Sequence, residues 1–287
     1  MLLLLVLTAL ILATPFGSAG QCLASLSMII LLGFIFPKTV GIFLQDSRFK
    51  TPPPWKTAIA LTILDLTVTF GLVLFWGTLI ALYFPDYLAR LEVFARETPA
   101  GTIEQVFIFI SGAIFVPLYE EFAFRGVALR AYERARSPIY AALLTSFIFA
   151  LVHGTLIQLL AFIPGSFLLA RCVQNRGSWW LAVIPHVVNN GLIFGVFPFL
   201  PPELEEEDPQ LIVGILALII AMIAFAIAAH WLKVFRVKKA EINLKTREFI
   251  WTPALMATIF FGIYMAIFTT FAPLDSEQIS RSIGMLG

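Results

Sequence analysis

The sequence has few charged residues and few cysteines, and each shortage excludes a class of protein. Only 13% of its 287 residues are charged, whereas 60% are hydrophobic, and the mean hydropathy is +0.92. No soluble globular domain needs so much apolar surface. The two cysteines, Cys22 and Cys172, form no CxxC pair, which argues against a disulfide framework or a cysteine-based zinc site. A net charge of +1, with no basic patch carrying interleaved aromatics, argues against nucleic-acid binding.

Long apolar stretches instead predict an all-α polytopic membrane protein. A run of about 18 apolar residues spans the bilayer core as a helix, and we predict a bundle of about eight such helices in one membrane domain. The candidate spans, of which the first and the sixth are short, are 1–15, 23–37, 57–84, 103–126, 138–153, 155–171, 178–199, 210–232 and 251–272. We divide the chain into N-terminal transmembrane helices (1–102), a core (103–200) and C-terminal transmembrane helices (201–287).

The loops carry an orientation signal. Basic residues are concentrated in four loops, at 38–56, 130–136, 171–176 and 233–247. The loop 201–209 is acidic and contains no base, and alternate threading puts all four basic loops on the opposite side. The positive-inside rule then makes the basic side cytoplasmic, so we expect a multi-pass protein of a prokaryotic-type cell membrane, in contact with the lipid bilayer.

Trp179 and Trp180 fall near a span end, where an interfacial aromatic belt is expected. The apolar start lacks a basic n-region, so we expect 1–20 to be an uncleaved membrane segment.

Polar residues at membrane depth are the candidate functional residues, because ionisable groups are costly there. The candidates are Glu120, Glu121, Arg125, His153, His186 and Asn190. Residues four apart share a helix face, which pairs Glu121 with Arg125 and His186 with Asn190. Adjacent residues differ by about 100°, so the two glutamates should point differently. Asp65 lies alone in its span, and we expect it to be structural or pore-facing rather than catalytic.

The depth of these residues follows from counting along the helices. Ser137 and Pro138 separate two spans, with Ser137 as the expected N-cap. Glu120 lies about 17 residues before this turn and His153 about 16 after it, so at 1.5 Å per residue both reach similar heights. His186 lies only about nine residues from the next loop, and its height matches less well unless its span is tilted or extended.

The chemistry of this residue set favours hydrolysis. A carboxylate and an imidazole on facing helices hold a water, which a buried carboxylate activates as general base. A second histidine with an amide one turn away offers donors for a developing oxyanion, and an arginine orients the glutamate pair. The sequence contains no HExxH or GxGD motif and no rhomboid-type serine motif. These patterns together indicate amide hydrolysis by an activated water inside the membrane.

Three motifs carry a resemblance to a known family. Residues 120–125 read EExxxR, residues 149–153 read FxxxH, and residues 186–190 read HxxxN. In this order on separate membrane helices, they resemble the CPBP (Abi) family, which includes the type II CAAX prenyl endopeptidases. The resemblance covers roughly 103–200. It implies a glutamate-dependent intramembrane endopeptidase with a catalytic core of four helices, acting on a membrane-anchored peptide or protein, possibly a prenylated CAAX-like one.

The resemblance also implies three pairs of roles. These are water activation by Glu120 with His153, oxyanion binding by His186 with Asn190, and orientation of the first glutamate by Glu121 with Arg125. No cofactor is expected. Zinc stays open as an alternative, with Glu120, His153 and His186 as its ligands.

Two other functions stay open from the sequence. An ion-coupled transporter could use Glu120, Glu121 and Asp65, because transporters also place carboxylates at membrane depth. It predicts an inverted repeat, which the sequence does not show. A non-catalytic immunity or scaffold protein would keep the fold and bind a partner, although the intact motifs argue against lost catalysis.

Overall fold

A computed structural model describes residues 41, 44–45, 47–87, 101–199 and 210–236. Within these ranges all regular structure is helical, which confirms the all-α class. Five helices are long and apolar enough to span a membrane: Trp55–Tyr83, Thr102–Arg134, Leu156–Arg176, Trp180–Phe199 and Leu211–Trp231. A shorter apolar helix covers Pro138–Leu151. The predicted spans 1–15, 23–37 and 251–272 lie outside the described residues, so the count of eight stays a prediction.

The helical elements follow one another without strands in the described parts of the chain. In order they are α4 (Ser47–Lys50), α5 (Trp55–Tyr83), α7 (Thr102–Phe109), η1 (Ile110–Phe115), α8 (Val116–Glu121), η2 (Phe122–Ala128), α9 (Leu129–Ala135), α10 (Pro138–Leu151), α11 (Leu156–Arg176), α12 (Trp180–Gly195), η3 (Phe197–Phe199) and α13 (Leu211–Trp231). Of these, η1 and η2 are π-helical and η3 is a 3₁₀ turn.

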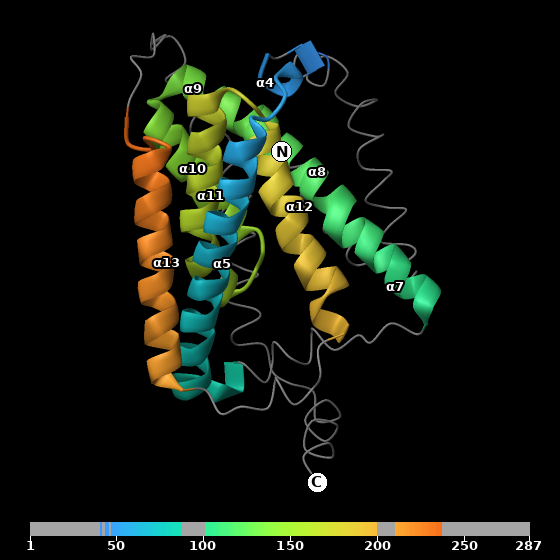
Figure 1. The fold of residues 1–287 in the computed structure, drawn as a ribbon, viewed down its shortest axis with the longest axis vertical. Coiled ribbons are helices and arrows are strands. Elements are labelled where there is room, and N and C mark those ends of the chain that lie inside the picture. The colour runs from blue at the N-terminus through green and yellow to red at the C-terminus, as the bar shows by residue number, and fades with distance from the viewer. Residues whose placement is uncertain (1–40, 42–43, 46, 88–100, 200–209, 237–287) are drawn as a thin grey trace.

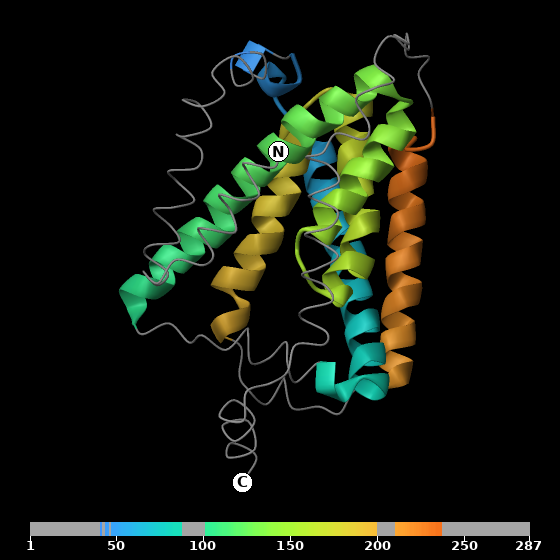
Figure 2. The ribbon, with the colours of Figure 1, turned by 180° about the vertical axis from the view of Figure 1, so that it is seen from behind.

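The bundle is built around α5, which packs against α13, α11 and α12. Small residues set the α5–α13 spacing. A Cβ on Gly71 would lie 2.8 Å from the carbonyl oxygen of Ala217 and 2.9 Å from Cβ of Ala221. In a membrane, lipid solvates large apolar side chains as well as a neighbouring helix does, so burying them adds little to helix association. The association of two such helices is stabilised mainly by close van der Waals packing of their backbones, which small residues permit. Figures 1 and 2 show α13 running alongside α5 at one side of the bundle.

The segment Thr102–Arg134 is one long helical run of 33 residues, interrupted by the π-helical turns η1 and η2. As a straight α-helix it would measure about 50 Å, well beyond the roughly 30 Å of a hydrocarbon core. In both views α7 and α8 run obliquely to the other helices (Figures 1 and 2). The expected span of 103–126 is therefore part of a longer, tilted helix.

Helix ends follow the local signals. Ser137 accepts a hydrogen bond from the backbone N–H of Tyr140 at 3.3 Å and Pro138 begins α10, which confirms the predicted cap. Thr155 caps α11 in the same way, through the N–H of Gln158. At its other end α11 stops at Arg176, and Gly177 follows as the C-cap. The φ of Gly177, +70°, is the left-handed conformation that glycine adopts without steric cost.

The described parts of the basic loops meet at one end of the bundle, as the alternate threading predicts. Arg48 pairs with Glu133 at 3.1 Å, joining α4 to α9. Nε of Arg171 donates to the carbonyl of Val234 at 2.6 Å, which joins the end of α11 to the segment after α13. Which face of the membrane this end meets stays a prediction.

Candidate active site

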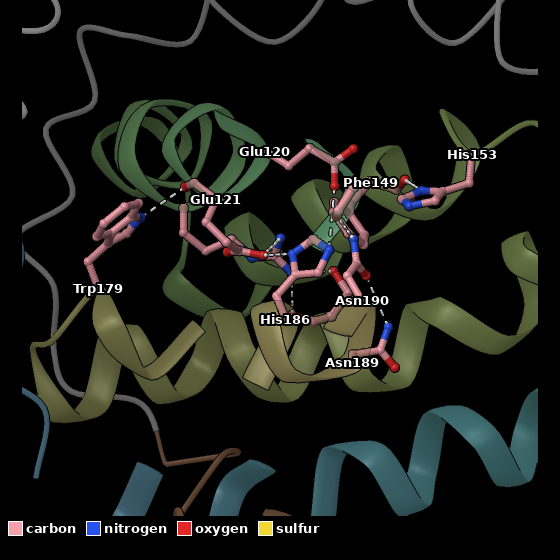
Figure 3. Close-up of polar contacts among 11 residues, drawn as sticks. Glu120, Glu121, Phe149, His153, Trp179, His186, Asn189 and Asn190 are labelled. Atoms are coloured by element: carbon pink, nitrogen blue, oxygen red, sulfur yellow. Dashed lines mark hydrogen bonds and ion pairs between the residues drawn. The ribbon is translucent and has the colours of Figure 1, made fainter. Parts of the chain in front are cut away.

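The two adjacent glutamates lie at the end of α8, where the helix changes to the π-helical η2. Glu121 is fully buried, whereas the side chain of Glu120 keeps 14% of its surface exposed. The α-helical step of about 100° between neighbours sends the two carboxyl groups in different directions, as the sequence predicts. Both carboxyl groups nevertheless reach the same partner, the imidazole of His186 (Figure 3).

His186 lies between the two glutamates. Its Nδ1 is 2.8 Å from Oε1 of Glu121, and its Nε2 is 3.5 Å from Oε2 of Glu120. An ionised carboxylate only accepts hydrogen bonds, so Nδ1 carries the proton that it donates to Glu121. This bond fixes the ring and directs Nε2 at Glu120. The counting argument, in which the height of His186 matches poorly unless its span is tilted or extended, therefore does not show how closely His186 approaches the glutamates. It assumed straight helices of uniform rise, whereas α8 belongs to an oblique, π-interrupted run.

Arg125 holds the second glutamate in place, as expected from the four-residue spacing. Its Nη1 donates to Oε1 of Glu121 at 2.8 Å, and both side chains are buried. Its Nη2 donates to Oγ of Ser166 at 2.8 Å and to the carbonyl of Ser166 at 3.3 Å. The guanidinium carbon also lies 4.5 Å from the ring centre of Phe149. Three helical elements thus fix one cation, and the cation fixes Glu121.

His153 lies just beyond the end of α10, and its ring points towards the region of the Glu120 carboxyl (Figure 3). Its Nδ1 donates to the carbonyl of Phe149 at 2.7 Å, which leaves Nε2 as an acceptor in the neutral ring. The ring packs edge-on against Phe149 and Phe162. Within the described residues, no hydrogen bond or ion pair joins His153 to Glu120.

Asn190 ties α12 to the π-helical turn η1. Its Nδ2 donates to the carbonyl of Gly112 at 2.9 Å, and its Oδ1 accepts from Nδ2 of Asn189 at 3.3 Å. The close approach of the two elements depends on Gly112, where a Cβ would lie 2.7 Å from the ring of Phe194. The expected oxyanion role of Asn190 stays a prediction, since one of its two amide protons is already engaged.

Phe149 and Trp179 belong to the site although the sequence reading did not place them there. The Phe149 ring lies beneath Arg125 and contacts the rings of both His153 and His186, with centres 4.7 and 5.6 Å away. The sequence feature that could have placed Phe149 in the site is its position as the first residue of the FxxxH motif. Trp179 is only 4% exposed and donates its indole N–H to the carbonyl of Glu121, so its expected place in an interfacial belt is wrong.

The residues do not fit the alternative of a zinc site. Among the described residues, no group of three or more His, Cys, Asp and Glu side chains is arranged to hold a metal ion. Glu120 and His186 come together, but His153 does not complete a ligand set with them. Zinc requires at least three protein ligands around one point, so no step of the chemistry below is assigned to a metal.

Asp65 of α5 is buried, with 5% of its surface exposed, and its Oδ1 has no hydrogen-bond partner among the described residues. It lies against Gly165, where a Cβ would be 2.8 Å from that oxygen. The neighbouring Ser166 binds Arg125, so Asp65 adjoins the support of the site. Within the part of the chain that the structure describes, no hydrogen bond or ion pair joins Asp65 to the glutamates or to the histidines.

Comparison with known proteins identifies the segment that carries this geometry. Residues 102–192 match the family model described as Type II CAAX prenyl endopeptidase Rce1-like. The matched segment runs from α7 into α12 and contains all six predicted site residues. No curated protein and no solved structure matches the chain. Residues 102–192 are therefore similar to the Rce1-like family of type II CAAX prenyl endopeptidases, and this match confirms the family resemblance of the three motifs.

Proposed function

We propose that the protein is a glutamate-dependent intramembrane endopeptidase that cleaves a membrane-associated peptide with an activated water. The observation that carries the proposal is the buried imidazole of His186, held by Glu121 on one nitrogen and facing Glu120 on the other. Arg125 occupies Glu121, so Glu120 is the glutamate left for proton transfer. Its side chain is partly exposed, and its buried Oε2 has no hydrogen-bond partner among the described residues, so we assign this carboxyl to the substrate water.

The assigned reaction is a general-base hydrolysis. Glu120 takes a proton from the water, and the water oxygen forms a bond to the carbonyl carbon of the peptide. The resulting tetrahedral oxyanion collapses, the C–N bond breaks, and Glu120 returns the proton to the leaving amine. Nε2 of His153 accepts the second hydrogen of the water, because its Nδ1–H is already donated to the carbonyl of Phe149. The two groups together would orient the attacking lone pair.

His186 acts on the charge that develops during this reaction. With Nδ1–H donated to Glu121, a proton on Nε2 can be donated either to Glu120 or to the oxyanion. The second amide proton of Asn190 is the further donor that we assign to the oxyanion. Glu121 and Arg125 hold the imidazole and do not exchange protons with substrate.

The substrate class follows from the location of the site. The cluster is formed by helices of membrane-spanning length, so the scissile bond belongs to a peptide anchored in or at the bilayer. A prenylated CAAX-like peptide is one such substrate. A second anchored peptide without the prenyl group distinguishes a lipid requirement from a need for membrane location alone.

The test is cleavage of both anchored peptides by the purified protein in detergent and in liposomes. Glu120→Gln and His153→Ala should each lower kcat by at least about a hundredfold, the usual contribution of a general base. Glu104→Gln is the matched control, because it makes the same chemical change in the first turn of α7, away from the cluster. Wild-type rates in both active-site variants would refute the proposed reaction.

We also propose that the basic end of the bundle faces the cytoplasm of a prokaryotic-type cell. The support is the meeting of the basic loops at one end, together with the positive-inside rule. Lys56, which is exposed at the start of α5, provides the probe position. A Lys56→Cys variant should react with an impermeant thiol reagent only after cell lysis, and equal labelling of intact cells would reverse the assignment.

A further inference from the structure

We propose that Trp179 is a positioning residue for Glu121, and that α4, which lies outside the matched domain, holds Trp179 in that role. Trp179 directly precedes α12 and is 4% exposed. Its indole N–H donates to the backbone carbonyl of Glu121 at 3.1 Å (Figure 3). Only the kinetic part of this inference rests on the proposed proteolysis.

The bond meets α8 at the residue where the helical register changes. Glu121 ends α8 and the π-helical η2 begins at the next residue. A shift of one residue rotates a helical side chain by about 100°, so a small change in this junction would swing both carboxyl groups away from the imidazole. A donor from outside the helix restrains the backbone at that point. The contact extends to both sides of the junction, because Leu118 of α8 and Phe122 of η2 pack against the cluster that contains the buried Trp179.

Trp179 is itself held by α4 and the residues next to it. Its backbone N–H donates to the carbonyl of Arg48 at 2.9 Å, and its ring lies 5.6 Å from that of Phe49. Oγ of Ser178 donates to the carbonyl of Thr51 at 2.9 Å. The Arg48 side chain pairs with Glu133 of α9, which anchors α4 to the far end of the glutamate-bearing helical run. Two ties thus join α4 to that run, one through Trp179 and one through Glu133.

The neighbouring Trp180 provides a matched control. Its indole N–H donates to the carbonyl of Phe49 at the same distance of 3.1 Å, but this bond joins α12 to α4 and does not reach α8. Trp179→Phe and Trp180→Phe therefore each remove one indole N–H at the start of α12 while keeping an aromatic ring. Only the first change removes a hydrogen bond to Glu121.

The kinetic test compares these variants in the anchored-peptide assay. Trp179→Phe should lower kcat between about tenfold and a hundredfold, as a small misplacement of a reacting group does, with KM nearly unchanged. Trp180→Phe should keep the wild-type kcat. Equal losses in the two variants would mean that the loop acts only as packing, and would overturn the inference.

A second measurement does not depend on proteolysis. A hydrophobic carbodiimide modifies buried carboxyl groups in their acid form, and mass spectrometry gives the rate at Glu121. Trp179→Phe should speed this labelling by about twofold to tenfold, the factor that corresponds to one hydrogen bond, while Trp180→Phe should match the wild type. A wild type that cleaves no peptide would refute the proposed function, and the labelling rates would still decide this inference.

A milder pair of variants serves if Trp179→Phe does not fold. Arg48→Gln removes the ion pair that anchors α4, whereas Lys50→Gln changes an exposed residue of the same short helix. The first should raise the labelling rate at Glu121 and the second should not. Identical rates in the two would overturn the role assigned to α4.

Discussion

Replacing Arg125 by methionine tests the buried charge pair that orders the site. The substitution keeps an unbranched chain of similar reach but removes the guanidinium. It leaves the Glu121 carboxyl, which is fully buried, without the guanidinium 2.8 Å away and with the Nδ1–H of His186 as its remaining side-chain donor. It also removes the hydrogen bonds to Ser166 and the cation that lies over Phe149.

The expected cost follows from the burial of both partners. Breaking a buried pair by removal of one partner destabilises a protein by about 3–5 kcal/mol, mainly because the remaining charge stays buried and unpaired. Glu121→Gln on its own leaves Arg125 with its two bonds to Ser166, so it should cost less. In the double variant neither charge remains, and we expect at least about 2 kcal/mol of the Arg125→Met loss to be recovered, within the range of couplings between residues in contact.

The assay is reversible unfolding in mixed micelles, followed by circular dichroism, on the wild type and the three variants. The free energies give a double-mutant cycle. Arg130→Met is the matched control, because Arg130 forms its ion pair with Glu133 at a partly exposed position, where such pairs contribute at most about 1 kcal/mol.

Two results would refute this reasoning. Arg125→Met could unfold within about 1 kcal/mol of the wild type, a loss as small as that of an exposed pair. Alternatively, the losses of the two single variants could add in the double variant within the usual error for independent sites, about 0.5 kcal/mol. Either result would mean that Glu121 is not held as a buried charge by Arg125.

Three further changes test the packing and the helix ends. Gly71→Ala should cost about 1–3 kcal/mol of unfolding free energy, because its Cβ would meet an α13 carbonyl at 2.8 Å. The control Gly77→Ala has open space around the new Cβ and should gain up to about 1 kcal/mol. Equal effects of the two changes would contradict the close α5–α13 contact. Gly165→Ala should be destabilising, because the new Cβ would lie 2.8 Å from the carboxyl oxygen of Asp65. In an Asp65→Ala background the same change should cost at least about 1 kcal/mol less. An unchanged cost would place the clash elsewhere. Ser137→Ala should cost about 1 kcal/mol through loss of the α10 cap, measured by the same unfolding assay, and no change would show that the cap contributes little.

The features that could be predicted rest on local chemistry. A serine before a proline predicts the start of α10, and Ser137 caps it in the structure. Placing an ionisable residue in an apolar membrane segment costs free energy, so such a residue is rare and stands out in the sequence. Glu120, Glu121 and His186 could therefore be selected without coordinates. The ion pair of Glu121 with Arg125 follows from helix periodicity alone.

The identity of the histidine that contacts the glutamates could not be predicted. Residue counting treats each span as a straight helix that rises 1.5 Å per residue, whereas η1, η2 and the oblique course of α7 and α8 change both height and direction. Pro117, in the first turn of α8 just after η1, was a local signal of an altered hydrogen-bond pattern. It does not give the direction of the tilt.

The supporting residues carried weaker signals. The chain has 28 phenylalanines, so position in a motif was the only feature that separated Phe149 from the rest. Ser166 and Gly165 lie in an ordinary apolar helix and act through long-range packing against η2 and α5. Trp179 was assigned to the interface from its place near a span end, which is reasonable for tryptophan on average but cannot detect a partner 58 positions earlier in the chain.

The π-helical turns also constrain the length of the chain between α7 and the glutamates. A π turn holds one residue more than the α turn it replaces, as if a residue had been inserted. If the π turn is retained, deleting a single residue from η1 rotates everything that follows by about 100° relative to α7. Glu120 and Glu121 would then both leave the imidazole. Insertions and deletions between 110 and 119 should therefore abolish the site, even at positions where a substitution is tolerated.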